Sequence, residues 1–248
     1  MMIPPLVAHR GYPLRYPENT LEGIEAALQC GVRYIEFDVQ LSADGVPVLC
    51  HDADLRRTAG VESSVLETKW RQLQKISVHE PSRFAQTYSS VTMPALAEFV
   101  AMFAVWPQAR AFVELKSESL DVFGVQSMTE KVLDVLRPVH SRCVIISDVV
   151  DALVCARKNG VSTGWIFDEW SEKAHLTAKT LMPEYLFCNY QRVPAGDSPL
   201  WAGSWQWGLY EISDPALARL WIARGADLIE TDAIGEMLEA LQENGVGH

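Results

Sequence analysis

The chain has 248 residues, of which 48% are hydrophobic, and carries a formal net charge of −11 at pH 7. This length can bury the core of one large α/β domain or of two small ones. The acidic balance disfavours nucleic acid as a partner, because phosphate backbones are bound by basic surfaces. No apolar run is long enough to indicate a transmembrane helix, so we expect no stable membrane insertion.

The N-terminal stretch MMIPPLVAHRGYP lacks a basic segment followed by an apolar one, so we expect no secretory signal peptide. The cysteines are odd in number and have neither disulfide-framework nor zinc-ribbon spacing. They are Cys30, Cys50, Cys143, Cys155 and Cys188. We therefore expect reduced thiols and a cytoplasmic protein. The sequence holds no signal for the oligomeric state.

Short apolar runs alternate with segments of helical spacing along the chain, which is typical of parallel strands covered by helices. The predicted principal strands start near residues 6, 34, 111, 143, 162, 185, 205 and 227, and an extra strand covers 46–50. The predicted helices cover 21–28, 65–76, 94–106, 122–137, 149–158, 172–180, 215–224 and 234–242, with at most a short helix near 199–202. Asn19 or Thr20 can cap the first of these helices.

Eight strand–helix units in about 250 residues are typical of a (β/α)8 TIM barrel. A doubly wound open sheet is the alternative, but it predicts a glycine-rich phosphate loop after the first strand. The sequence His9-Arg10-Gly11-Tyr12-Pro13 does not have that pattern. The polar stretch at about 53–92 interrupts the alternation. We therefore expect residues 1–248 to form a single barrel domain with an insertion at about 53–92.

Two carboxylates, Glu36 and Asp38, stand two residues apart in the second predicted strand. Alternate residues of a strand share a face, so these side chains project side by side. A divalent cation would offset their repulsion, since hard cations prefer carboxylate oxygens. The alternative is the exposed side of an edge strand. His51 and Asp52 follow the extra strand and bring an imidazole and a third carboxylate close to the first pair. Asp52 is equally suited to cap a helix or form a turn.

Functional residues of a barrel lie at the C-terminal ends of its strands. His9 and Arg10 end the first predicted strand, and Glu114 and Lys116 end the third. Acidic side chains suit a hard cation, basic ones suit a phosphate group, and histidines suit proton transfer near neutral pH. Attack of water on a phosphoester needs all three, so the set favours phosphoester hydrolysis.

The order and spacing of these motifs resemble those of the glycerophosphodiester phosphodiesterases, over nearly the whole chain. The segments that carry the resemblance are His9-Arg10-Gly11, Pro17-Glu18-Asn19-Thr20, Glu36-Phe37-Asp38-Val39, His51-Asp52, Glu114-Leu115-Lys116 and Gly225-Ala226-Asp227-Leu228-Ile229-Glu230-Thr231-Asp232. The resemblance implies a TIM barrel with a small insertion after the second strand. It also implies metal-dependent hydrolysis of a small-molecule glycerophosphodiester, a product of lipid metabolism, to glycerol 3-phosphate and an alcohol.

The resemblance further implies roles for individual residues. A divalent cation, Ca²⁺ or Mg²⁺, would be held by Glu36, Asp38 and Glu114. The catalytic acid–base pair would be His9 and His51. The phosphate would be held by Arg10, with assistance from Lys116. The nucleophile would be either water or the neighbouring glycerol hydroxyl, which would form a cyclic phosphate.

The sequence departs from the family in the seventh strand, where Tyr210-Glu211-Ile212-Ser213 replaces a Trp-Thr-Val-Asn pattern. If Glu211 faces the mouth of the barrel, it adds a negative charge near the leaving alcohol and bears on headgroup preference. Three alternatives stay open. They are a related phosphodiesterase acting on lysophospholipids or another headgroup, a non-catalytic barrel that binds a phosphorylated ligand, and a metal-dependent lyase or isomerase.

Overall fold

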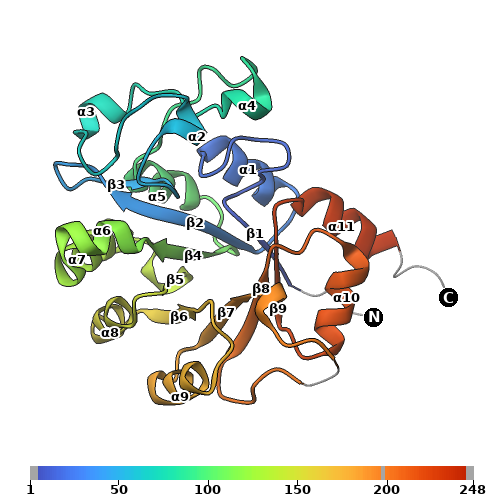
Figure 1. Cartoon of the computed structure of the whole chain (residues 1–248). Helices are drawn as coiled ribbons and strands as arrows, with labels where there is room; N and C mark the ends of the chain where they lie inside the picture. Colours follow the sequence, from blue (N-terminus) through green and yellow to red (C-terminus); the bar gives the residue numbers. More distant parts are fainter. Residues whose placement is uncertain (1–4, 197–198, 244–248) are drawn as a thin grey trace.

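The computed structural model describes residues 5–196 and 199–243. Residues 1–4, the start of the segment expected to lack a signal peptide, lie outside the described residues. Nine strands of the described chain belong to one sheet (Figure 1). They are β1 (Leu6–Ala8), β2 (Tyr34–Leu41), β3 (Pro47–Leu49), β4 (Arg110–Leu115), β5 (Cys143–Ser147), β6 (Ser162–Ile166), β7 (Tyr185–Asn189), β8 (Gln206–Tyr210) and β9 (Leu228–Thr231).

All strands except β3 pair in parallel with the next one along the chain, and β9 pairs with β1, which closes the ring. The short β3 instead runs antiparallel on β2. A closed ring of parallel strands with a helix after most of them is a TIM barrel, so the predicted fold is confirmed and the open sheet is excluded.

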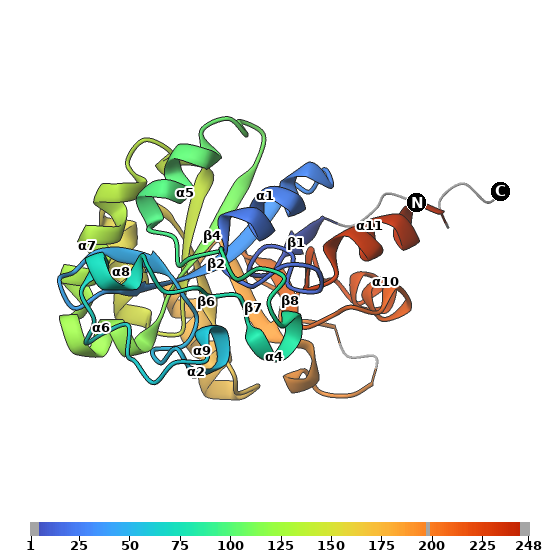
Figure 2. The same ribbon diagram turned by 90° about the horizontal axis from the view of Figure 1, so that it is seen from above.

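Helices surround the barrel, as Figure 2 shows from above. They are α1 (Leu21–Gln29), α5 (Leu96–Phe103), α6 (Ser117–Phe123), α7 (Val125–Leu136), α8 (Val150–Lys158), α9 (Glu172–Leu181), α10 (Pro215–Ala223) and α11 (Ile234–Glu243). The predicted helix over 122–137 is interrupted at Gly124, whose φ of 83° favours glycine. Residues 199–202 are not helical. No helix in the described ranges combines the length and apolar character needed to cross a bilayer.

Residues 53–92, which we call the inserted segment, lie on the α1 side of the barrel and carry three short helices (Figure 1). These are α2 (Arg56–Ala59), α3 (Trp70–Leu73) and α4 (Pro81–Phe84). The predicted helix over 65–76 is wrong outside α3. Val65 is fully buried in a small separate core, and its N–H donates to the carbonyl of Ala53, 2.8 Å away. Burial of an apolar side chain in that core outweighs helical spacing.

The interior of the barrel divides into an apolar floor and a polar mouth. The floor is a buried cluster of Val7, Phe112, Val144, Ile146, Tyr185, Phe187 and Leu228. A Cβ atom on Gly208 would lie 2.4 Å from the Phe187 ring, so glycine makes room for this floor. Two residues further along a strand, the side chains on the same face become polar. Thus His9 follows Val7, Glu114 follows Phe112, Asp148 follows Ile146 and Glu230 follows Leu228.

Candidate active site

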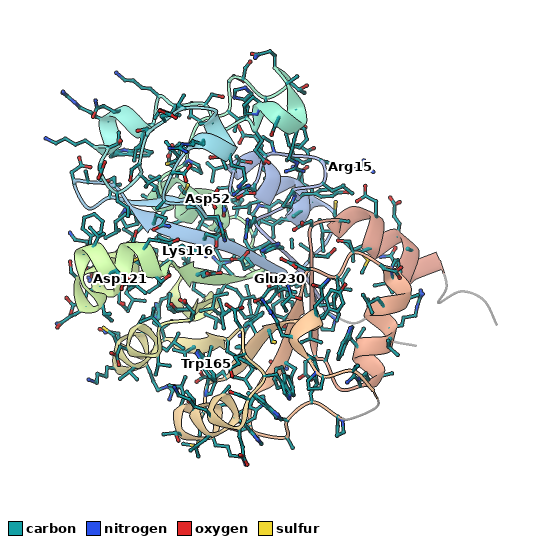
Figure 3. All side chains as sticks on the ribbon, in the orientation of Figure 1. Arg15, Asp52, Lys116, Asp121, Trp165 and Glu230 are labelled. Atoms are coloured by element: carbon teal, nitrogen blue, oxygen red, sulfur yellow. The ribbon has the colours of Figure 1, made fainter. Side chains whose placement is uncertain are left out.

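A cavity of about 260 Å³ opens at the polar mouth. Six of the seven residues predicted from the sequence line it: His9, Arg10, Glu36, His51, Glu114 and Lys116. The seventh, Asp38, is 1% exposed and lies just behind the lining. Figure 3 shows Lys116 and Glu230 toward the middle of the molecule, whereas Arg15 and Asp121 lie at its margin. The fold therefore gathers side chains from four separate sequence segments around one cavity.

The three carboxylates expected to bind a cation lie together. Residues Asp38 of β2 and Glu114 of β4 are paired across the two strands, and Glu36 is on the same face as Asp38. One oxygen from each of the three carboxylates lies within 4.8 Å of the others. Glu36 is only 2% exposed, so the edge-strand alternative is wrong. Buried oxygens Oε1 of Glu36 and Oδ1 of Asp38 have no hydrogen-bond partner in the described structure, which fits a cation site.

The two predicted phosphate-binding residues border this carboxylate triad. Arg10 Nε lies 3.2 Å from Asp38 Oδ2, and Lys116 Nζ lies 2.7 Å from Glu114 Oε1 and 3.6 Å from Asp38 Oδ1. Burial would raise the pKa of Asp38, but Arg10 and Lys116 outweigh it and hold that pKa well below its usual range. Burial and the charge of Asp38 raise the pKa of Glu114 to about 7, although Lys116 and Arg10 act in the opposite direction. Burial, with the charges of Asp38 and Glu230, likewise raises the pKa of Glu36 well above its ordinary value, so the triad contains one strong and two weak acids.

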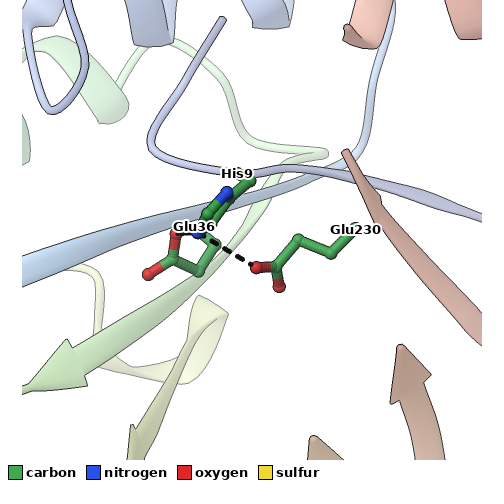
Figure 4. Close-up of side chains that lie close together, drawn as sticks. All are labelled: His9, Glu36 and Glu230. Atoms are coloured by element: carbon green, nitrogen blue, oxygen red, sulfur yellow. Dashed lines mark ion pairs between the residues drawn. The ribbon is translucent and has the colours of Figure 1, made fainter. Parts of the chain in front are cut away.

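His9 is enclosed by acidic residues. Its Nδ1 lies 2.7 Å from Asp232 Oδ1. Its Nε2 lies 3.5 Å from Glu230 Oε1 and 4.0 Å from Glu36 Oε2 (Figure 4). Burial lowers the pKa of the His9 imidazole, but Glu230, Asp232 and Glu36 outweigh it and raise the pKa to about 10. The surroundings therefore favour the protonated ring.

His51 has a similar partner on Nδ1, which lies 2.6 Å from Asp52 Oδ1. The other oxygen of Asp52 accepts a hydrogen bond from Arg57 Nε at 2.7 Å. Asp52 is therefore neither a helix cap nor only a turn residue, since Leu55 occupies the N-cap position of α2. In both histidines Nδ1 is engaged by a carboxylate, which leaves Nε2 for proton exchange.

Four further residues belong to this network, although they had no predicted role. Glu230 lines the cavity and Asp232 holds His9. Glu18 is 7% exposed and accepts hydrogen bonds from Arg10 Nη1, at 3.2 Å, and from both terminal nitrogens of Arg57. The sequence does hold a signal for Glu18, Glu230 and Asp232, because each stands in a segment that carries the family resemblance. Arg57 had no such signal.

Asn19 is a supporting residue of the carboxylate triad. Its side-chain amide donates to Asp38 Oδ2 at 2.9 Å, and its Oδ1 accepts from the Asp38 backbone N–H at 3.0 Å. The cap of α1 is Thr20, whose hydroxyl accepts from the Gly23 N–H. Of the two residues considered as the cap, Thr20 performs that role, and Asn19 orients Asp38.

The far side of the mouth is acidic. Asp148, Asp168 and Glu211 are exposed and line the cavity together with Tyr210. Glu211 therefore does face the mouth, and it accepts a hydrogen bond from Asn189 Nδ2 at 2.6 Å. Its φ is 65°, a left-handed conformation shared by Arg10 at 50° and Asn19 at 54°. This backbone conformation is costly for most residues other than glycine, although asparagine adopts it more readily than arginine or glutamate does.

Comparison with known proteins gives consistent results. The sequence profile described as the glycerophosphoryl diester phosphodiesterase family matches residues 9–180, more than half of the chain. A glycerophosphodiester phosphodiesterase of Bacillus altitudinis is 30% identical over 52% of this chain and 52% of its own length. The glycerophosphoinositol inositolphosphodiesterase GDPD2 of Mus musculus is 26% identical over 96% of this chain. The chain spans only 48% of the length of that relative.

Among solved structures, a phosphodiesterase from Oleispira antarctica in complex with the product sn-glycerol-3-phosphate superimposes with a TM-score of 0.83. The superposition covers 97% of each chain at 23% sequence identity. At that identity the likeness establishes the barrel fold, in agreement with the strand order described above.

Proposed function

Because the chain belongs to the glycerophosphoryl diester phosphodiesterase family, we propose that it hydrolyses glycerophosphodiesters to glycerol 3-phosphate and an alcohol. One observation carries this proposal. Two histidines, each with Nδ1 on a carboxylate at 2.7 and 2.6 Å, line a cavity that also contains Arg10 and Lys116. The glycerol 3-phosphate bound to the structural relative from Oleispira antarctica supports the choice of substrate class.

The cation of this proposal is Ca²⁺ or Mg²⁺, with Glu36, Asp38 and Glu114 as its ligands. Support comes from the all-oxygen donor set and from the buried oxygens of Glu36 and Asp38 that lack hydrogen-bond partners in the described residues. When bound, such an ion supplies charge neutralisation at a phosphate oxygen. Asn19 keeps the Asp38 carboxylate in a fixed orientation through two hydrogen bonds.

The residues of the chain divide the remaining work. Arg10 and Lys116 bind the phosphate and share its negative charge. His9, which its acidic neighbours keep protonated, donates a proton from Nε2 to the departing alcohol. His51 accepts a proton at Nε2 from the nucleophile, which is either water or the neighbouring glycerol hydroxyl. Asp232 and Asp52 hold the two rings in place through Nδ1, so that Nε2 of each ring carries out the proton transfer.

We further propose that the barrel and the inserted segment act as one catalytic domain, because Arg57 of that segment contacts both Glu18 and Asp52. A reducing compartment such as the cytoplasm is part of the same proposal. All five cysteines lie within the described residues and are free thiols.

The test is an assay of the purified protein with glycerophosphocholine, glycerophosphoethanolamine, glycerophosphoglycerol and lysophosphatidylcholine, each with titrated Mg²⁺ and Ca²⁺. We expect release of glycerol 3-phosphate from the first three substrates, and reversible loss of turnover with EDTA. Following the reaction by ³¹P NMR would reveal a cyclic phosphate if the glycerol hydroxyl is the nucleophile. Faster cleavage of the lysolipid would support the alternative substrate class, and binding without turnover would support a non-catalytic barrel.

A further inference from the structure

A second set of metal-ligating atoms adjoins the carboxylate triad. It consists of His9 Nε2 and one carboxylate oxygen each from Glu36 and Glu230, all within 4.8 Å of one another (Figure 4). Glu36 lies on β2, Glu230 on β9 and His9 just beyond β1, which pairs with both strands, and their side chains converge at the mouth of the barrel. Glu36 belongs to both sets, while His9 and Glu230 belong only to the second.

The spacing of these atoms suits a small ion. Zinc is bound by imidazole nitrogen and carboxylate oxygen at about 2.0–2.2 Å, so two ligands of a tetrahedral site lie about 3.3–3.5 Å apart. His9 Nε2 lies 3.5 Å from Glu230 Oε1 and 4.0 Å from Glu36 Oε2. A shift of about half an ångström in the Glu36 carboxylate would bring both contacts to that spacing.

The environment of His9 is one that metal-binding histidines usually have. A ligating imidazole typically donates its other ring N–H to a carboxylate, which fixes the ring and increases its basicity. Here Nδ1 of His9 lies 2.7 Å from Asp232 Oδ1. The ring is therefore oriented with Nε2 toward Glu230 and Glu36 before any ion arrives.

Two buried oxygens at this place lack a hydrogen-bond partner in the part of the chain that the structure describes. They are Oε1 of Glu36 and Oε2 of Glu230. Glu230 is only 4% exposed, and leaving a buried carboxylate oxygen without a partner is costly. The other oxygens of the same two carboxylates, Oε2 of Glu36 and Oε1 of Glu230, face His9 Nε2, so a cation that both oxygens of each carboxylate approach would remove that cost. The cavity supplies the open side from which an ion and a water ligand can enter.

We propose that His9, Glu36 and Glu230 form a second cation site, selective for a transition metal such as Zn²⁺, whose occupation stops hydrolysis. Selectivity follows from the donors, because imidazole suits Zn²⁺ whereas the oxygen-only triad suits Mg²⁺ or Ca²⁺. Inhibition rests on the proposed function, in which His9 Nε2 exchanges a proton. Coordination occupies the lone pair of that nitrogen, so the proton cannot be held there.

The binding experiment uses the whole chain in excess Mg²⁺, to which Zn²⁺ is added before dialysis and metal analysis. Co²⁺ serves as a second probe, since its visible spectrum reports tetrahedral coordination with an imidazole ligand. We expect one zinc per chain in the wild type and in Glu239→Gln, a change of an exposed glutamate on α11. Glu230→Gln should weaken zinc binding at least about tenfold, and Asp232→Asn about 10- to 100-fold. Zinc that replaced Mg²⁺ at the triad would not respond to Glu230→Gln.

The inhibition experiment measures glycerophosphocholine turnover in excess Mg²⁺ as Zn²⁺ is raised. We expect turnover of the wild type to fall below about one tenth of its zinc-free value as the second site fills. The same inhibition of Glu230→Gln should need a zinc concentration at least about tenfold higher. If the wild type retains no zinc, or if Glu230→Gln binds it equally well, the site is disproved. Zinc that binds without reducing turnover disproves the inhibition. A wild type that hydrolyses no glycerophosphodiester disproves the proposed function, while the binding measurement still decides the site.

Discussion

Arg57 donates to the carboxylate of Glu18 through both terminal nitrogens, with Nη1 2.6 Å from Oε2 and Nη2 2.7 Å from Oε1. The same guanidinium reaches Asp52 through Nε at 2.7 Å. Asp52 in turn holds His51, and Glu18 accepts from Arg10. One side chain of the inserted segment thereby supports both a proposed proton carrier and a proposed phosphate ligand. Such a planar two-point contact is specific to arginine.

Arg57→Ala should therefore lower kcat/KM for glycerophosphocholine about 10- to 100-fold, because Asp52 and Glu18 lose the group that fixes them. Arg57→Lys should recover only part of the loss, since an ammonium cannot make the two-point contact. Arg56→Ala is the matched control, as Arg56 is exposed and contacts only Glu62, 3.8 Å away, among the ion pairs of the described chain. Long-range ¹H–¹⁵N spectra of the His51 ring should change in Arg57→Ala. Equal kinetics and ring spectra in the two alanine variants would refute the positioning role.

His9→Ala and His51→Ala should each reduce turnover by about 10²- to 10⁴-fold, the usual contribution of general acid–base catalysis. Calcium binding, measured by titration calorimetry, should persist in both variants because neither ring belongs to the carboxylate triad. His140→Ala, at an exposed position, serves as the control. Near-normal turnover in both active-site variants would overturn the assignment of the acid–base pair.

Saturating Ca²⁺ or Mg²⁺ should stabilise the fold. A ligand at about one hundred times its Kd adds about 2.7 kcal/mol, which corresponds to an increase in Tm of roughly 5–10 °C for a chain of this size. Differential scanning calorimetry with the metal and with EDTA measures this difference. Asp38→Asn should abolish the shift, whereas Asp121→Asn, at the margin of the molecule in Figure 3, should preserve it. A shift that survives in Asp38→Asn would place the cation elsewhere.

The metal-free protein should lose stability between pH 7 and pH 8.5. The pKa of His9 is raised to about 10 in the folded chain and is about 6.5 when unfolded, so its stabilising effect is complete below pH 6.5 and is lost as pH rises toward 10. The free energy of unfolding should therefore fall by up to about 1.4 kcal/mol per pH unit. Urea unfolding in EDTA measures the slope. His9→Gln should flatten it and His140→Gln should not; a flat wild-type profile would contradict the prediction.

The acidic side of the mouth should favour an alcohol with a positive charge. Glu211→Gln is expected to lower kcat/KM for glycerophosphocholine relative to glycerophosphoglycerol by about two- to fivefold, a modest effect because the residue is exposed. The difference in substrate preference between the wild type and Glu211→Gln should become smaller as salt concentration rises. Glu169→Gln, which changes another exposed acid, should leave the substrate preference of the wild type unchanged. An unaltered ratio in Glu211→Gln would exclude a role in headgroup choice.

The barrel could be predicted because its strands are apolar runs and its helices have regular spacing. The inward residues could be predicted too, since a charged residue in a buried strand, as at Glu36, stands out against its neighbours. The helix over 65–76 could not be excluded from the sequence. Its spacing was helical, and the small core that captures Val65 depends on residues distant along the chain.

The residues that contact the site residues were harder to predict from the sequence. Asp232 is 223 positions from His9, and no local pattern ties the two. Glu230 showed the same signal as Glu36, a carboxylate in a buried run, but the family pattern gave it no role. Arg57 stood in a polar stretch in which nothing distinguished it from Arg56. Pairings of this kind are set by the closure of the barrel and by the fold of the inserted segment.

The left-handed backbone at Arg10, Asn19 and Glu211 affects how such a protein responds to selection for stability. Glycine would relax the chain at each of these positions, so a search for heat-resistant variants should be drawn to them. Each such variant would discard a side chain that the cavity or its support uses. Thermal stability and catalysis therefore compete at these three positions. Selection for stability alone would replace these side chains and lead to a barrel without activity.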